Sequence, residues 1–151
     1  MNISRWAEKE IGGRLIRLHD TVYQKTNGRI GHRIPGLPPT LLLHTIGAKT
    51  GLPRTHALTY ACDKDAYLIV ASNSGSFRHP NWYHNLRKNP GVEINVGAKR
   101  FKVVARRVMP EDSDYQRLWQ IVNKNNFNQY DRYQHRTSRP LPIFALTAGT
   151  A

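Results

Sequence analysis

The spacing of apolar residues changes near residue 40 and divides the chain into an N-terminal helical part and a longer part of short strands. Over residues 5–25 the apolar positions recur every three or four residues, with arginine and lysine between them. This period predicts an amphipathic helix. The segment that follows, up to residue 39, is rich in glycine and proline and is predicted to be a linker.

From residue 40 onward, short runs of apolar, aromatic and β-branched residues alternate with turn sequences. Each run is the length of a strand. The predicted strands are 41–46, 55–61, 67–72, 92–96, 101–108 and 143–146, of which the first three should form a meander. Helices are predicted at 80–88 and after Asp114. Five or six antiparallel strands with peripheral helices indicate a mainly β (α+β) fold, a small antiparallel β-barrel.

The length of the chain is that of one structural domain. Within it, we expect residues 1–39 to form the N-terminal helix and linker, and residues 40–151 to form the barrel. No apolar run is long enough to span a membrane, and the first residues lack the apolar core of a secretory signal. We therefore expect a cytoplasmic protein.

The chain carries 23 basic and 10 acidic side chains, a formal net charge of +13, which favours an anionic partner. Nucleic acid, lipid headgroups and phosphorylated cofactors all fit that charge. Because the basic residues are spread singly or in pairs rather than in a run, we do not expect nucleic-acid binding. The basic N-terminal helix leaves open a peripheral contact with a membrane; its alternative role is to cap the barrel.

A bend bounded by two glycines, Gly47 and Gly51, is the most informative motif. Glycines allow a tight turn with exposed amides, and Lys49 and Arg54 bring two cations to the same place. Such a bend can hold a phosphate or a carboxylate. It is not a phosphate loop of the nucleoside triphosphatases, because Pro53 blocks the helix that must follow. A solvated hairpin tip is the alternative interpretation.

Two further segments combine aromatic and polar residues. The first runs from residue 71 to residue 86, where small polar residues lead into a short helix that carries Trp82 and Asn85, as in a ligand cradle. In the second, Tyr130 and Tyr133 share one face if the segment is helical. In both cases packing of the aromatic rings against the barrel is the alternative.

The sequence offers no pattern for metal binding or hydrolysis. The histidines do not have the spacing of metal ligands, no Gly-x-Ser-x-Gly sequence is present, and no pair of carboxylates stands out. We therefore expect no metal site.

Taken in order, the bend at 47–54, the segment 79–90 and the aromatic region near the C-terminus resemble the deazaflavin-dependent nitroreductase family. The resemblance covers about residues 41–146. It implies a split β-barrel fold, related to that of the flavin-dependent pyridoxamine phosphate oxidases, and the use of reduced coenzyme F420.

The resemblance also implies which residues form the site. Lys49, Thr50 and Arg54 would bind the phosphate and acidic tail of F420. The full set of implied cofactor-binding residues is Ala48, Lys49, Thr50, Arg54, Val70, Ser72, Asn73, Gly75, Asn81, Trp82 and Asn85. Ser72, Tyr130 and Tyr133 are the catalytic candidates, as donors of a proton or a hydrogen bond.

At three positions the chain departs from the family pattern. Members commonly carry a basic residue in place of Ala48 and a lysine in place of Asn73. Thr59 stands where some members present a tyrosine toward the substrate, so the reduction of nitro compounds does not follow from the resemblance.

The sequence thus predicts an F420-dependent oxidoreductase that transfers a hydride to a quinone, a nitroaromatic or another unsaturated small molecule. Two alternatives within this fold are an FMN-dependent split-barrel oxidoreductase and a non-catalytic carrier of F420. A third, from another class, is a binder of nucleic acid or membrane surfaces driven by the net charge. We expect a monomer or a homodimer.

Overall fold

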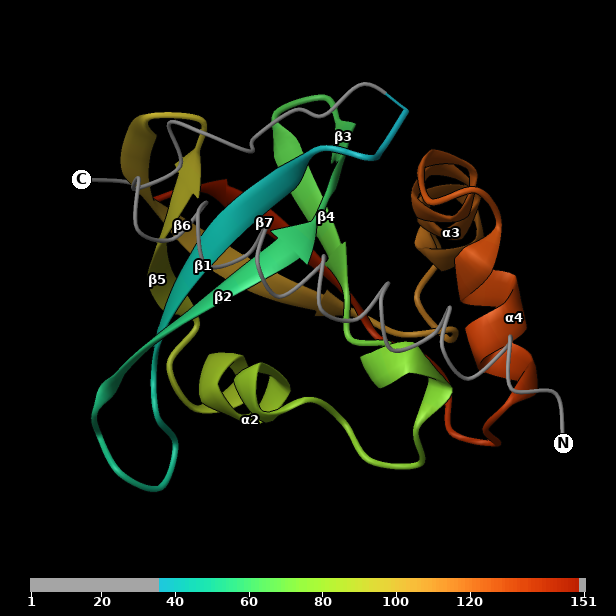
Figure 1. The fold of residues 1–151 in the computed structure, drawn as a ribbon, viewed down its shortest axis with the longest axis horizontal. Helices are drawn as coiled ribbons and strands as arrows, with labels where there is room; N and C mark the ends of the chain where they lie inside the picture. Colours follow the sequence, from blue (N-terminus) through green and yellow to red (C-terminus); the bar gives the residue numbers. More distant parts are fainter. Residues whose placement is uncertain (1–35, 150–151) are drawn as a thin grey trace, which may run out of the picture.

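The computed structural model describes residues 36–149, and within this range it contains a sheet of seven strands, three α-helices and one short 3-10 helix (Figure 1). The predicted amphipathic helix over 5–25 lies outside the described residues. The elements are β1 (Thr40–Ile46), β2 (Pro53–Thr59), β3 (Ala61–Asp63), β4 (Ala66–Val70), η1 (Asn73–Gly75), α2 (Asn81–Lys88), β5 (Gly91–Val96), β6 (Lys99–Val108), α3 (Tyr115–Asn125), α4 (Gln129–His135) and β7 (Ile143–Ala148). None of the helices in the described range is long and apolar enough to cross a membrane.

The sheet is antiparallel throughout and has the strand order β2-β1-β5-β6-β7-β4-β3. β2 and β3 follow one another in the chain, separated by Tyr60 alone, yet they form opposite edges of this order. A single residue can join the two edges only if the sheet curls until they lie close together. The seven strands therefore form a curled, barrel-like sheet, which confirms the predicted antiparallel barrel with one strand more than expected.

The prediction of one strand over 55–61 and of a three-stranded meander is wrong. The strand ends at Thr59, and Ala61 pairs with Leu68 of β4 rather than with β1. The amide of Tyr60 still bonds to the carbonyl of Pro39. The chain therefore passes from one edge of the sheet to the other at Tyr60, and because β4 pairs with β7, β2 and β4 are not neighbours.

β6 links the two halves of the sheet. Its first part pairs with β5 and its last part with β7, so the strand takes part in both. The alternation that predicted one wet face is present, since buried Val103 and Val108 lie among exposed lysines and arginines. Because it pairs with both β5 and β7, this long strand joins the two halves of the curled sheet.

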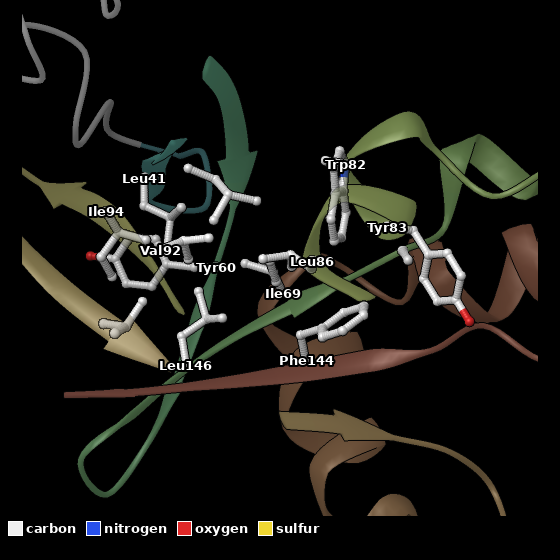
Figure 2. Packing of buried hydrophobic residues seen from close by; sticks show 13 residues of the cluster. Leu41, Tyr60, Ile69, Trp82, Tyr83, Leu86, Val92, Ile94, Phe144 and Leu146 are labelled. Carbon is white, nitrogen blue, oxygen red and sulfur yellow. The ribbon is translucent and has the colours of Figure 1, made fainter. Parts of the chain in front are cut away.

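The inside of the curl is filled by apolar side chains from the strands and from α2 (Figure 2). Trp82, Tyr83 and Leu86 on α2 point into this cluster, and the Trp82 and Tyr83 rings meet Phe144 at centroid distances of 5.9 and 5.8 Å. Burial of this apolar face fixes α2 against the sheet. Another face of α2, with Asn81 and Asn85, lies toward the segment between β1 and β2.

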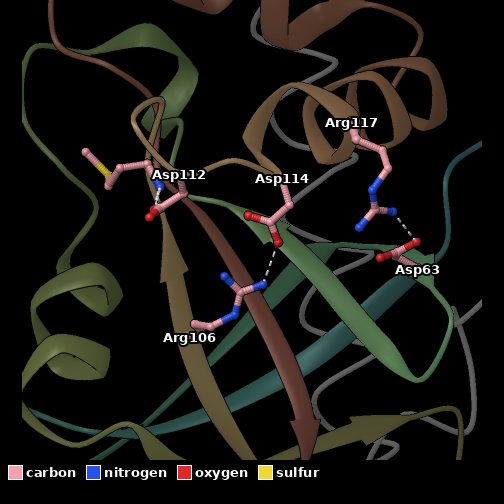
Figure 3. Close-up of polar contacts among 6 residues, drawn as sticks. Asp63, Arg106, Asp112, Asp114 and Arg117 are labelled. Atoms are coloured by element: carbon pink, nitrogen blue, oxygen red, sulfur yellow. Dashed lines mark hydrogen bonds and ion pairs between the residues drawn. The ribbon is translucent and has the colours of Figure 1, made fainter.

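α3 and α4 cover a second cluster of buried side chains. Ion pairs fix the start of α3 to the sheet: Arg106 bonds Asp114 and Arg117 bonds Asp63, both at 2.8 Å (Figure 3). Asp112 also accepts a bond from the Met109 amide. Because these pairs are exposed to solvent, each contributes little to stability. They orient α3, and α4 packs beside it.

Candidate functional site

The bend between β1 and β2 is held closed by its own backbone. The Gly47 amide bonds the Leu52 carbonyl, and the Gly51 amide bonds the Gly47 carbonyl, each at 2.8 Å. A Cβ at position 47 would lie 2.5 Å from the Thr50 hydroxyl oxygen, so any larger residue there would require that hydroxyl to move. The predicted tight turn is therefore present.

α2 fixes the position of this bend. The Ala48 amide donates to Oδ1 of Asn85 at 2.8 Å, and Nδ2 of Asn85 donates to the Thr45 hydroxyl at 3.0 Å. Nζ of Lys88 reaches the Ala48 carbonyl at 2.8 Å. Asn85 is buried, so these bonds join the bend and the helix rigidly. The bend lies beside the helix that carries Trp82, as the resemblance requires.

Only part of the bend's backbone is open to a ligand. The expectation of generally exposed amides needs correction, because those of Gly47, Ala48, Gly51 and Leu52 all have partners inside the protein. Among residues 36–149, no partner exists for the amides of Lys49 and Thr50. These two amides are the ones that can bind an anion.

A cleft of about 670 Å³ opens between this bend and α2. We call it the cation cleft, and its lining residues are Gly47, Ala48, Lys49, Thr50, Arg54, His56, Phe77, Arg78, His79, Asn81, His84 and Asn85. No aspartate or glutamate of residues 36–149 is among them, whereas Lys49, Arg54 and Arg78 are cations. None of these three has a carboxylate partner within the described part of the chain. The cation cleft therefore has a strong positive potential suited to an anionic ligand.

His56 is a further lining residue of the cation cleft. It lies two residues after Arg54 on β2, and thus on the same face of that strand. Its Nε2 atom is buried and has no hydrogen-bond partner among residues 36–149. Burial, and secondarily the Arg54 charge, lower the pKa of His56, so the free ring is neutral near pH 7.

The residues implied to surround the deazaflavin ring lie largely outside the cation cleft, in the loop between β4 and α2 (residues 71–80). Gly75 has a φ of +78°, and a Cβ there would lie 2.6 Å from the Tyr133 carbonyl oxygen. Glycine is therefore needed for this loop to pack against α4. Asn73 donates to the Arg78 carbonyl at 3.0 Å. The loop brings Ser72 and Asn73 to the same side of the molecule as α4.

Arg139 fixes the shape of this loop. Its guanidinium donates to the carbonyls of Ser72 and Ser76 at 2.8 Å, to those of Ala71 and Arg78 at 3.2 Å, and to Nδ1 of His79 at 3.1 Å. Since the loop supplies Phe77, Arg78 and His79 to the cation cleft, Arg139 connects both parts of the site. His79 must accept this bond on Nδ1. Burial, with the Arg139 charge second, lowers the pKa of His79 and keeps it neutral.

Trp82 and Val70, implied as ring contacts, lie in the core. Trp82 is only 5% exposed and Val70 only 7%, and neither lines the cation cleft. Of the implied cofactor-binding residues, the structure brings together Ala48, Lys49, Thr50, Arg54, Asn81 and Asn85 in the cation cleft. Ser72, Asn73 and Gly75 form the neighbouring loop. Their roles toward a cofactor stay predictions.

Tyr130 and Tyr133 lie on α4, and their rings meet edge to face at 6.2 Å. The predicted shared face is thus present. Tyr130 is buried, and burial, with the neighbouring Tyr133 second, raises its pKa above the ordinary value. The Tyr133 hydroxyl bonds Gln129 at 3.3 Å. With its pKa raised, Tyr130 stays protonated near neutral pH and can only donate, not act as a base.

Three residues of this region, His56, Arg78 and Arg139, have no role predicted from the sequence. The alternation of side chains along a strand could have found His56, because it follows Arg54 by two positions. No local signal marks Arg139. Its acceptors lie some 60 residues earlier in the chain and include four backbone carbonyls, which have no sequence signature.

Comparison with known proteins decides the family. The sequence profile described as F420H(2)-dependent quinone reductase matches residues 15–148. A protein named F420H(2)-dependent quinone reductase, from Mycobacterium tuberculosis strain H37Rv, is 67% identical over 147 residues, which cover 97% of this chain and 99% of that one. The chain belongs to the F420H(2)-dependent quinone reductase family. The resemblance to F420-dependent enzymes is thereby confirmed.

A second relative from the same organism, a putative F420H(2)-dependent quinone reductase, is 33% identical over 72% of this chain and 88% of its own length. Among solved structures, an F420-H2 dependent reductase superposes with a TM-score of 0.64 and 32% identity, covering 72% of this chain and 93% of that one. A structure described as a domain-swapped dimer gives 0.65 and 27% identity, covering 96% and 99%. These neighbours confirm the split-barrel fold.

The residues present fit the cofactor for which this family is named. Reduced F420 carries a phosphate and an acidic tail. Within residues 36–149, the cation cleft offers Lys49, Arg54 and Arg78 without a competing carboxylate, together with two unpaired amides. It also holds a buried histidine nitrogen that has no partner in the described part of the chain. The donors of the cleft therefore match the oxygen-rich, anionic part of the cofactor.

Proposed function

We propose that this chain binds reduced F420 with its phosphate and acidic tail in the cation cleft and its ring toward the loop between β4 and α2, and reduces a quinone. The observation that carries the proposal is the composition of the cation cleft: among the lining residues that the structure describes there are three cations, two amides without a partner and no acidic side chain. Charge-assisted hydrogen bonds of this kind are the strong ones in protein recognition of phosphate and carboxylate.

The bound cofactor supplies the hydride. The work of the chain is to bind and to orient. Lys49, Arg54 and Arg78 hold the anionic end, while Asn85 keeps the bend at a fixed distance from α2. Because Arg139 fixes the loop at five points, the ring side of the site is held in one geometry before the substrate arrives.

Reduction of a quinone to a hydroquinone requires a hydride and one proton, and negative charge develops on the quinone oxygen. Ser72, Tyr130 and Tyr133 are the proposed donors toward that oxygen. The loop with Ser72 and the helix with both tyrosines pack together through Gly75, which supports this assignment. The raised pKa of Tyr130 keeps it a donor near neutral pH.

A quinone is the preferred substrate class because the relatives that match the whole chain are named quinone reductases. Thr59, in place of the tyrosine found in some nitroreductases, lies at the end of β2 and is consistent with this preference. We expect nitroaromatics to be reduced more slowly than quinones.

The test is the anaerobic oxidation of reduced F420 by the purified protein, followed by the return of the absorbance of oxidised F420. A naphthoquinone, a nitroaromatic and an α,β-unsaturated ketone are compared at equal concentration. Turnover with the naphthoquinone supports the proposal. Tight binding of F420 with no turnover of any substrate would favour a carrier, and binding of FMN alone would favour an FMN-dependent enzyme.

We further propose a homodimer, one of the two states that the sequence leaves open. A neighbour that covers nearly the whole chain is described as a domain-swapped dimer. Light scattering coupled to gel filtration measures the mass directly. A mass near 17.3 kDa would mean a monomer and refute this proposal.

A further inference from the structure

His56 stands out in the described part of the chain because its Nε2 is the one buried side-chain nitrogen or oxygen without a hydrogen-bond partner. Buried polar atoms in folded proteins are nearly always paired, since each unpaired one costs about 1 to 3 kcal/mol. Because the His56 side chain lines the cation cleft, a ligand bound there is the candidate partner for this nitrogen.

The position of His56 limits what that partner can be. On β2, its side chain lies on the same face as Arg54, about 7 Å farther along the strand. Leu58, the next residue on this face, packs against the core. His56 is thus at the inner end of the cation cleft, between the cations that suit the acidic tail and the apolar interior of the sheet.

The other polar side chains of the cleft do not satisfy it. Asn85 uses its amide on Ala48 and Thr45, and His79 uses Nδ1 on Arg139. Arg54 and Arg78 can only donate. Burial, and secondarily the Arg54 charge, lower the pKa of His56, so the ring is neutral and one of its nitrogens carries a proton.

We propose that Nε2 of His56 donates a hydrogen bond to an oxygen of the linker of bound F420, the ribityl and phosphate part between the ring and the acidic tail. This inference rests on the proposed function. The cations of the cleft bind the acidic end of the cofactor. His56 is a further residue, and it binds the middle of the cofactor. In the free protein the same nitrogen is unpaired, so His56 stabilises the complex and not the fold.

The proposal predicts opposite effects on stability and on binding. Replacing His56 by leucine removes the unpaired buried atom, so the free protein should melt at the same temperature as the wild type or above it. The same variant should bind F420 more weakly by roughly five- to tenfold. His56→Gln places an amide nitrogen near the position of Nε2 and should restore binding to within about twofold.

The experiment measures the dissociation constant of F420 by fluorescence titration and the melting temperature without cofactor, for the wild type and both variants. His135→Leu, a change of an exposed histidine on α4, is the matched control and should alter neither. The titrations are repeated with the deazaflavin riboside, which has the ribityl chain but neither phosphate nor tail. A loss confined to F420 assigns the bond to the phosphate, whereas an equal loss with both ligands assigns it to the ribityl chain.

Unchanged F420 binding by His56→Leu would overturn the inference while leaving the proposed function intact. Equal weakening by leucine and glutamine, with a lowered melting temperature, would also overturn it, because the effect would then be structural. A wild type that does not bind F420 at all would instead refute the proposed function, and the inference with it.

Discussion

Replacing Arg139 by methionine should destabilise the protein and loosen the loop that carries Ser72. The guanidinium bridges four backbone carbonyls and His79, and no uncharged side chain can replace that set of bonds. Methionine keeps much of the length of the arginine stem and its packing, so the change isolates the loss of the donors.

The expected loss of folding free energy is estimated from the two bonds of 2.8 Å, which go to the carbonyls of Ser72 and Ser76. Each is charge-assisted, and such a bond contributes about 1.5 kcal/mol at the low end of the range, which suits a half-buried group. The expected loss is therefore about 3 kcal/mol. For a chain of this size that corresponds to a decrease in melting temperature of roughly 6 to 12 °C.

The assay is thermal unfolding by circular dichroism, with Arg132→Met as the control, because Arg132 lies on exposed α4 surface and makes no bond within the described residues. Arg139→Lys should behave almost like methionine, since one ammonium group cannot span the acceptors. F420 should also bind more weakly to Arg139→Met. A melting temperature within about 2 °C of the wild type would refute the reasoning.

Two other predictions concern stability. Gly75→Ala should cost more than about 1 kcal/mol, because φ is +78° and the added Cβ would meet the Tyr133 carbonyl oxygen at 2.6 Å; a chemical-denaturation midpoint equal to that of the wild type would contradict it. Burial is the main cause of the lowered pKa of His44, His56 and His79. Their neutral forms are favoured in the fold, so their contribution is complete above the unfolded pKa of 6.5 and is lost as the pH falls through the folded values. The melting temperature should rise between about pH 5.5 and about pH 7.5, and more steeply in the wild type than in His56→Leu.

The sequence alone predicts much of this molecule where a feature depends on neighbouring residues. Gly51 has a φ of +69° in the bend, a conformation that favours glycine for local reasons. The helix at 81–88 follows from apolar spacing and the preceding proline. The alternation of apolar and basic residues in β6 likewise predicts one solvent-exposed face. These features are set by interactions within a few residues.

The features that the sequence does not predict depend on distant contacts. The break at Tyr60 arises because the two edges of a curled sheet meet there, which no local pattern records. The amides of the bend are mostly paired because Asn85, on another element, reaches one of them. From the sequence alone, Arg139 cannot be told from an ordinary surface arginine, because its acceptors are backbone carbonyls of residues 71–78.

The central claim is that the cation cleft holds the anionic part of F420, and equilibrium binding tests it most directly. The dissociation constant of F420 is measured by fluorescence for the wild type, Lys49→Ala, Arg54→Ala and the control Lys64→Ala, whose lysine lies in the turn between β3 and β4. We predict weakening of roughly tenfold for each of the first two and none for the control. Wild-type affinity in both Lys49→Ala and Arg54→Ala would contradict the account.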